Sequence, residues 1–243
     1  MTAPLASARS NLLLISMFAL AGIVVLAGLG TWQLQRLSWK EALVERMALR
    51  LQQAPVEFEK ALKQQSAGEN VDFLRVKLRG TYDHAKGQYF YALNKSAYGW
   101  RVLTPLTAES GRSILVDRGF VPDPQKPLAA PALSGPVEVV GALRLDYLPR
   151  EMFTPDNNVS TNSWYWFDVT ALRKVTAIPE LAPMVIQLDT PDHSGQWPVA
   201  TPLSPNLPNK HFGYALTWFG LAITLLGVYI AFIVQERRKR SSP

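Results

Sequence analysis

Two long stretches without a charged residue, one near each end of the 243-residue chain, constrain its fold more than any other feature. Residues 12–30 form a run of 19 uncharged residues, and residues 212–234 form a run of 23. As α-helices that rise 1.5 Å per residue, these runs would be about 28 and 35 Å long, and the hydrocarbon core of a bilayer is about 30 Å thick. The sequence therefore predicts two transmembrane helices, over residues 12–31 and 211–234.

The first of these helices is predicted to be a retained anchor and not a cleaved signal peptide. Only one cation, Arg9, precedes it, and its apolar run is longer than the 7–15 residues or so of a signal-peptide core. The helical pattern also continues without a break until Pro55. We therefore expect an amphipathic helical extension over residues 32–54.

Positive charge gives the expected orientation. Four consecutive cations, residues 237–240, follow the second apolar run and favour a cytoplasmic tail over residues 235–243. The first helix is ambiguous by this rule, because Arg36, Lys40, Arg46 and Arg50 outnumber Arg9. Two spans place both ends on one side, so residues 1–11 are also expected in the cytoplasm and residues 55–210 outside it. The N-terminus is too short and too poor in arginine for a mitochondrial transit peptide, which favours the inner membrane of a bacterium and a periplasmic central domain.

The central domain is predicted to be mostly antiparallel β-structure, with a barrel-like arrangement, so the fold class is a membrane protein of the α+β type. Short runs rich in valine and aromatic residues alternate with Gly, Pro, Asn and Asp. The candidate strands are residues 73–79, 89–93, 101–105, 114–118, 137–144, 163–169 and 184–188. One short helix is expected over residues 168–174. Proline-rich connectors are expected over residues 122–136 and 201–210.

Charge and cysteine content exclude several classes of function. The net charge is +6, but residues 234–243 supply +3 and Arg9 one more. Most of the excess positive charge therefore lies at the ends of the chain, where it indicates membrane orientation and not a surface that binds nucleic acid. The chain has no cysteine. Thiolate metal sites, disulfides and covalent haem attachment are therefore excluded.

No sequence motif of a hydrolase, nucleotide-binding enzyme or zinc protease occurs, so we do not expect an enzyme. His84 and His193 each follow an aspartate in a polar turn and are interpreted as solvated loop side chains. Asp117 and Arg118, at the end of a buried strand, are interpreted as structural partners.

The third histidine, His211, begins the second apolar run and shares a helical face with Tyr214 and Trp218. That face offers a nitrogen ligand beside aromatic walls, although a histidine that only hydrogen-bonds at headgroup level fits as well. Glycines at 213, 220 and 227 recur every seven residues on a neighbouring face. We expect them to allow close approach of the first helix, near Ala21, Gly22 and Gly28.

Several motifs in order resemble the Surfeit locus protein 1 family of cytochrome c oxidase assembly factors. They are Gly30, Trp32, Gln33, Arg36, Leu37, Trp39 and Lys40 at the first helix, GWRVLTPL at 99–106, ILVDRGFVP at 114–122, VEVVGALR at 137–144 and NKHFGYALTWFGLA at 209–222. The resemblance covers nearly the whole chain. Asp117 stands where asparagine is frequent in the family, a departure expected to matter little.

The resemblance implies a function in the assembly of a haem-copper oxidase. Haem a would be bound as cargo and handed to cytochrome c oxidase subunit I, with haem a synthase as a further candidate partner. His211 matches the family's candidate axial ligand, and Tyr214 and Trp218 suit a flat macrocycle. Arg36 and Lys40, one turn apart, are our hypothesis for the haem propionates, with snorkelling to lipid headgroups as the alternative.

Three further expectations remain open. Trp32 could pack on the porphyrin, although the interfacial aromatic belt explains it as well. A scaffold without haem that docks onto nascent oxidase subunits is an alternative function, and an outward-facing membrane enzyme is a second alternative. Membrane lipid is an expected partner, and nucleic acid is not.

Overall fold

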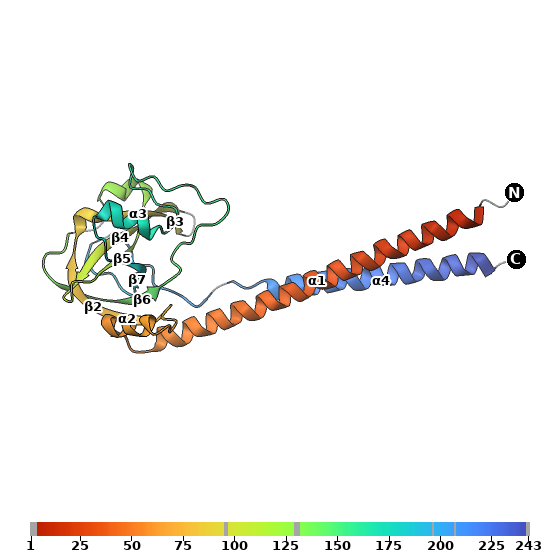
Figure 1. Cartoon of the computed structure of the whole chain (residues 1–243), viewed down its shortest axis with the longest axis horizontal. Coiled ribbons are helices and arrows are strands. Elements are labelled where there is room, and N and C mark those ends of the chain that lie inside the picture. Colours follow the sequence, from red (N-terminus) through yellow and green to blue (C-terminus); the bar gives the residue numbers. More distant parts are fainter. Residues whose placement is uncertain (1–3, 95–96, 129–131, 196, 207, 242–243) are drawn as a thin grey trace. The chain divides into compact units, whose positions relative to one another are not determined.

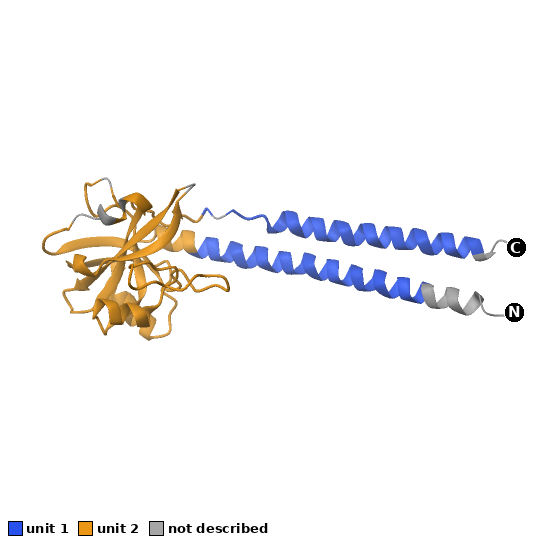
Figure 2. Ribbon diagram, turned by 90° about the horizontal axis from the view of Figure 1, so that it is seen from above, with its two compact units in different colours: residues 1–46, 206–243 blue, residues 47–205 orange. Residues whose placement is uncertain are grey.

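Helices occupy the two ends of the chain and strands its middle (Figure 1). The structure, a computed structural model, describes residues 4–94, 97–128, 132–195, 197–206 and 208–241. The first three residues of the predicted cytoplasmic N-terminus, the last two of the tail and residues 129–131 of the predicted connector lie outside this description. The chain divides into two units, coloured separately in Figure 2: unit 1 is Met1–Arg46 with Asn206–Pro243, and unit 2 is Met47–Pro205.

Unit 1 contains one long helix and most of another, whose last six residues belong to unit 2. Helix α1 spans Pro4–Gln52 and helix α4 spans His211–Ser241. Both are long and apolar enough to cross a membrane, over Leu12–Gln52 and His211–Lys239. Helix α1 continues past the first apolar run as far as Gln52, so residues 53–54 of the expected extension are not helical. The basic tail continues α4 without a break up to Ser241.

Unit 2 is built on one seven-stranded sheet. Its strands are β1 (Val56–Glu57), β2 (Arg75–Tyr82), β3 (Gln88–Asn94), β4 (Ala97–Ala108), β5 (Ser113–Pro122), β6 (Val137–Arg144) and β7 (Leu181–Leu188). The strand order is β1-β2-β6-β7-β5-β4-β3, and a further pairing of β2 with β4 closes five strands into a barrel. The pairs β1–β2 and β5–β7 are parallel and the others antiparallel. The predicted mostly antiparallel, barrel-like domain is confirmed.

Strand β5 lies at the centre of the core because both of its faces are covered. Nine of its ten residues are buried, the pattern of a strand with no solvent face. Ile114 and Val116 belong to one hydrophobic cluster, and Leu115, between them in sequence, belongs to another. The motif that contains β5 is therefore fixed by packing on two sides.

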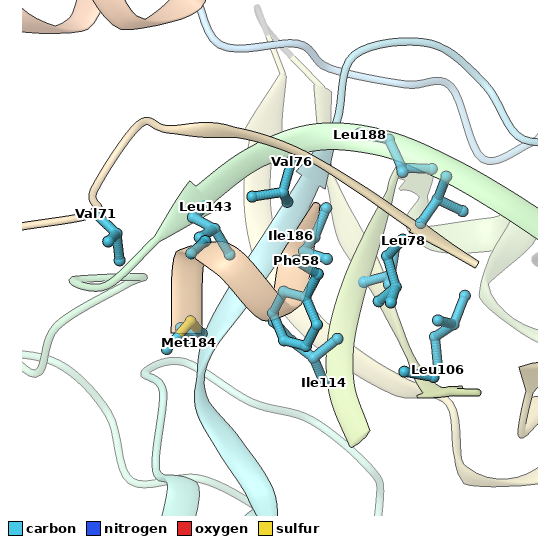
Figure 3. Close-up of a cluster of buried hydrophobic side chains, with 14 of the residues drawn as sticks. Phe58, Val71, Val76, Leu78, Leu106, Ile114, Leu143, Met184, Ile186 and Leu188 are labelled. Atoms are coloured by element: carbon cyan, nitrogen blue, oxygen red, sulfur yellow. The ribbon is translucent and has the colours of Figure 1, made fainter. Parts of the chain in front are cut away.

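Two short helices cover the sheet. Helix α2 (Phe58–Ser66) inserts Phe58, 1% exposed, into the first cluster, which Figure 3 shows beside Ile114 and Ile186. Helix α3 (Val169–Thr176) inserts Leu172 into the second cluster. Asp168 caps α3, since its carboxylate accepts the Ala171 N–H at 3.0 Å.

One helix of unit 2 was missed, and one expected strand is wrong. Helix α2 was not predicted, and the predicted strand over residues 163–169 does not form. In that segment Ser163 and Trp164 make only isolated bridges, and Asp168 already caps α3. The expected helix at 168–174 is confirmed as α3. The connector at 122–136 contains short 3-10 turns, η2, over Asp123–Leu128.

Candidate functional site at the start of helix α4

The site in unit 1 begins where the proline-rich segment 201–210 turns into α4. Asn209 precedes the helix, and its side-chain oxygen accepts the backbone N–H of His211 at 3.3 Å. The Lys210 carbonyl accepts the N–H of Tyr214 at 3.2 Å and starts the helical ladder. An Asn before a helix satisfies N–H groups that have no partner within the helix. His211 therefore occupies the first turn of α4 at a defined position.

The two helices of unit 1 share a seam of small and apolar side chains. Half-buried or buried positions recur at steps of three and four residues, which is the spacing of a left-handed coiled-coil contact. On α1 they include Leu12, Ser16, Ala19, Ile23, Leu26, Gly30, Gln33, Leu37 and Lys40. On α4 they include His211, Ala215, Trp218, Ala222, Leu225 and Tyr229. His211 thus lies on the face of α4 that contacts α1.

The glycines that bring the helices together are not the predicted ones on α4. A Cβ at Gly30 would lie 2.7 Å from the Phe219 ring, and one at Gly22 would lie 3.0 Å from Leu225. At positions 28, 213, 220 and 227 a Cβ would meet no atom within 4 Å. The expectation for the three α4 glycines is therefore wrong, because the seam of α4 uses Ala215 and Ala222 instead.

A single hydrogen bond joins His211 to the first helix. Its Nδ1 lies 2.7 Å from Oε1 of Gln33, 178 positions earlier in the chain. Since a side-chain carbonyl oxygen can only accept, the imidazole Nδ1 carries the proton and donates it. In its neutral form the ring then presents Nε2 as an unprotonated atom with a free lone pair, and no hydrogen bond to Nε2 is found among the described residues. That atom can coordinate a metal ion.

The cations predicted to hold propionates lie on the same end of α1. Lys40 donates from Nζ to the carbonyl of Pro208, just before α4. The Arg36 guanidinium lies over the Trp39 ring, 4.4 Å from its centroid, a cation–π contact that stabilises exposed arginines modestly. Lys40 thus ties the segment before His211 to α1, and the propionate hypothesis stays a prediction.

The predicted aromatic walls differ in exposure. Trp32 is 52% exposed and Tyr214 is 55% exposed, whereas Trp218 is half-buried on the seam. Large aromatic surfaces left open on an apolar helix pair are available to lipid or to a flat apolar ligand. Gln33 was missed as a site residue, although its spacing of three from Gly30 places it on the seam.

Unit 2 holds a buried polar network that was not expected from the sequence. The Arg118 side chain is 0% exposed and binds both carboxylate oxygens of Asp192, at 2.7 and 3.1 Å. Nδ1 of His84 lies 3.5 Å from the Arg118 guanidinium, and its Nε2 accepts the Leu133 N–H at 2.9 Å. The His193 side chain is 2% exposed. The interpretation of both histidines as solvated loop residues is therefore wrong.

Asp117 centres a second buried network beside the first. It is 1% exposed and pairs with Arg101. Its carboxylate also accepts the Tyr147 hydroxyl at 2.8 Å and the Gly119 N–H at 3.0 Å. Burial first, and then the Asp117 charge, raise the pKa of Tyr147 well above its usual value. Asp117 and Arg118 each belong to a structural ion pair, with Arg101 and Asp192 and not with each other, and Asp117 has a larger part in the core than expected.

Comparison with known proteins assigns the family. Residues 20–223 match the SURF1 family. The chain is similar to Surfeit locus protein 1 of Mus musculus, with 32% identity over 80% of this chain and 67% of that protein. It is also similar to the SURF1-like proteins of Monosiga brevicollis (30% identity, 90% and 87% covered) and of Rickettsia prowazekii (28%, 90% and 89%). The chain belongs to the SURF1 family.

Proposed function

We propose that this protein is an assembly factor for cytochrome c oxidase, the function for which the SURF1 family is known, and that it binds haem a as cargo through His211. In this proposal it resides in the inner membrane of a bacterium, with α1 and α4 as its two spans and unit 2 in the periplasm. It assists insertion of haem a into subunit I. It acts as a binding protein and not as an enzyme.

The observation that carries the haem proposal is the state of the His211 ring. Nδ1 is occupied by Gln33 and Nε2 is left as a lone-pair donor. Groups of three or more metal-ligating side chains do not occur among the described residues. One imidazole would nevertheless be sufficient for haem, because the porphyrin brings four nitrogen ligands of its own. The donor set therefore fits a haem iron better than a free metal ion.

The surroundings of His211 suit a macrocycle. Trp32 and Tyr214 expose flat apolar rings, which can pack against a porphyrin face or edge. Arg36 and Lys40 can offer cations to carboxylates at the surface, with Lys40 retaining two of its three N–H donors beside the Pro208 bond. In this proposal the chain binds and orients the cargo, and subunit I is the acceptor.

The deciding experiment is a reduced-minus-oxidised spectrum of the protein purified from cells that make haem a. We expect a haem a signal in wild type, its loss in His211→Ala, and partial recovery when imidazole is added. Ile223→Ala, an exposed position further along α4, is the matched control and should keep the signal. A colourless wild type despite ample haem a supply would refute haem binding.

A second candidate is a haem-free docking scaffold, and one observation favours it. Met152 and Phe153 in unit 2 are 89% and 92% exposed, beside Tyr91 and Tyr165 around a cavity of about 380 Å³. Exposed apolar groups of this kind are typical of contact surfaces. Replacing Met152 and Phe153 by serine should lower co-purification of oxidase subunits without changing haem content if this scaffold role is correct.

A further inference from the structure

The hydrogen bond between Gln33 and His211 has a consequence for the ligand atom itself. A neutral imidazole has two tautomers, and only the nitrogen without a proton can coordinate a metal. Because Oε1 of Gln33 is an acceptor at 2.7 Å, the proton is held on Nδ1 and Nε2 becomes the coordinating atom. We propose that Gln33 is a positioning residue that sets the tautomer and the ring orientation of His211; this inference rests on the proposed haem-binding function.

Placing the Gln33 amide on this seam is energetically unfavourable, which suggests that the amide has the positioning role proposed here. Apart from Ser16, Lys40, His211 and Tyr229, the other seam residues named above are apolar or small, and a polar group in such a setting is unfavourable unless it is hydrogen-bonded. Methionine could fill the same volume with no polar atom to satisfy. The glutamine instead directs its carbonyl at the one imidazole in unit 1 among the described residues.

The geometry around the pair is fixed on both helices. On α1, the missing side chain at Gly30, one seam step before Gln33, lets the Phe219 ring approach. On α4, Asn209 holds the first turn, and Lys40 holds the carbonyl of Pro208. The imidazole and the amide are thereby held on elements that cannot slide past one another without breaking several contacts.

A hydrogen bond to the second ring nitrogen of a coordinating histidine has measurable effects on a metal centre. A carbonyl that accepts the Nδ1 proton increases the electron donation of Nε2 and orients the ring, and losing such a partner commonly costs roughly 10- to 100-fold in affinity. Stronger donation from an axial imidazole favours ferric over ferrous iron. The strength of the acceptor at position 33 should therefore tune the reduction potential of the bound haem.

Two substitutions separate this role from simple helix packing. Gln33→Met keeps the length and volume of the side chain but removes the acceptor, whereas Gln33→Glu offers a stronger acceptor. The matched control is Tyr229→Phe, which removes another hydrogen bond between the same helices, from Tyr229 Oη to Ser16 Oγ at 2.8 Å. That control weakens the helix pair without touching His211.

The first measurement uses the full-length protein in detergent without haem. Nitrogen-15 NMR of histidine-labelled protein, assigned with His211→Ala, should show the Nδ1–H tautomer at His211 in wild type and in Tyr229→Phe. Gln33→Met should shift the population toward Nε2–H. An unchanged tautomer in Gln33→Met, or an Nε2–H tautomer in wild type, would overturn the inference whether or not haem binds.

The second measurement uses the haem-loaded protein. The midpoint potential should rise in Gln33→Met and fall in Gln33→Glu, with haem affinity reduced roughly 10- to 100-fold in Gln33→Met. Equal potentials across wild type and both variants would refute the positioning role while leaving haem binding in place. Absence of haem from wild type would instead refute the proposed function, and with it any effect of Gln33 on haem.

Discussion

Arg118 and Asp192, 74 positions apart in sequence, form a two-point ion pair whose side chains are 0% and 5% exposed. The pair connects the middle of β5 to the segment that follows β7. Both side chains lie where water cannot solvate a lone charge, so each depends on the other. The pair therefore ties β5 to a segment far from it in the sequence.

Removing one member of this pair should be more damaging than removing both. Asp192→Ala leaves the Arg118 charge buried without its main partner, and such losses cost about 3–5 kcal/mol. The double variant Arg118→Met/Asp192→Ala should lose less stability than Asp192→Ala alone. Urea unfolding of the full-length protein in detergent, followed by tryptophan fluorescence, measures both. Additive losses in the double variant would contradict the coupling.

The raised pKa of Tyr147 predicts how the stability of unit 2 changes with pH in the alkaline range. Its pKa is raised by burial and by Asp117, whereas the unfolded phenol ionises near pH 10. The folded form keeps its proton at a pH where the unfolded form loses it, so this contribution to stability is complete below about pH 10 and decreases as pH rises above it.

Unfolding midpoints between pH 8 and 11 test this expectation. Tyr147→Phe should be less stable than wild type at pH 8, because the hydrogen bond to Asp117 is lost, but should lose less stability between pH 10 and 11. Tyr98→Phe, at an exposed position, serves as control and should follow the wild-type curve. If the stability of Tyr147→Phe falls with pH as steeply as that of wild type, other groups determine the pH dependence of stability in this range.

Gly119 in the ILVDRGFVP motif should not tolerate a side chain. Its φ is +122°, and an added Cβ would lie 2.2 Å from the Val199 carbonyl oxygen. We expect Gly119→Ala to lower the free energy of unfolding by at least about 1–3 kcal/mol, the cost of such backbone strain. Gly87→Ala is the control, because φ is −61° there and the nearest atom would be 3.5 Å away. Similar unfolding midpoints for the two variants would refute the steric argument.

Gly30 should control the separation of α1 and α4. Gly30→Leu would collide with the Phe219 ring, whereas Gly28→Leu, two residues earlier, would meet no neighbour at its Cβ. Because the chain has no cysteine, spin labels at Leu34→Cys and Phe212→Cys report one distance between the helices. That distance should lengthen or broaden in Gly30→Leu alone. An unchanged distribution would exclude Gly30 as the contact that sets helix spacing.

Much of the fold follows from local patterns. The charge-free runs identify both long helices, and the strand expected at 137–144 coincides with β6. Helix α2 was missed because its buried residues, Phe58 and Ala61, are only two among polar neighbours directly after Pro55. The expected strand at 163–169 failed because the segment makes no continuous ladder, and only Trp164 and Phe167 among its aromatic residues pack into the second hydrophobic cluster. Trp164 is 0% exposed and makes only one bridge, to Phe90.

The candidate site could be predicted only in part. His211 stands out because a titratable residue begins an apolar helix. Its partner Gln33 could not be chosen, since pairing across 178 positions depends on how two helices rotate against each other. The same rotation decided which glycines meet the neighbouring helix. His84 was misjudged for a related reason, because its partners Arg118 and Leu133 lie 34 and 49 positions away in the sequence.

The histidine and its glutamine belong to the last and the first helix of the chain. During synthesis the amide is made early, and the imidazole joins it only after the ribosome has translated everything between them. A polypeptide that stops short of the final helix, or fails to insert it, therefore lacks the paired ring altogether. Only a chain with both helices synthesised and inserted would have the paired histidine ready to bind a cargo.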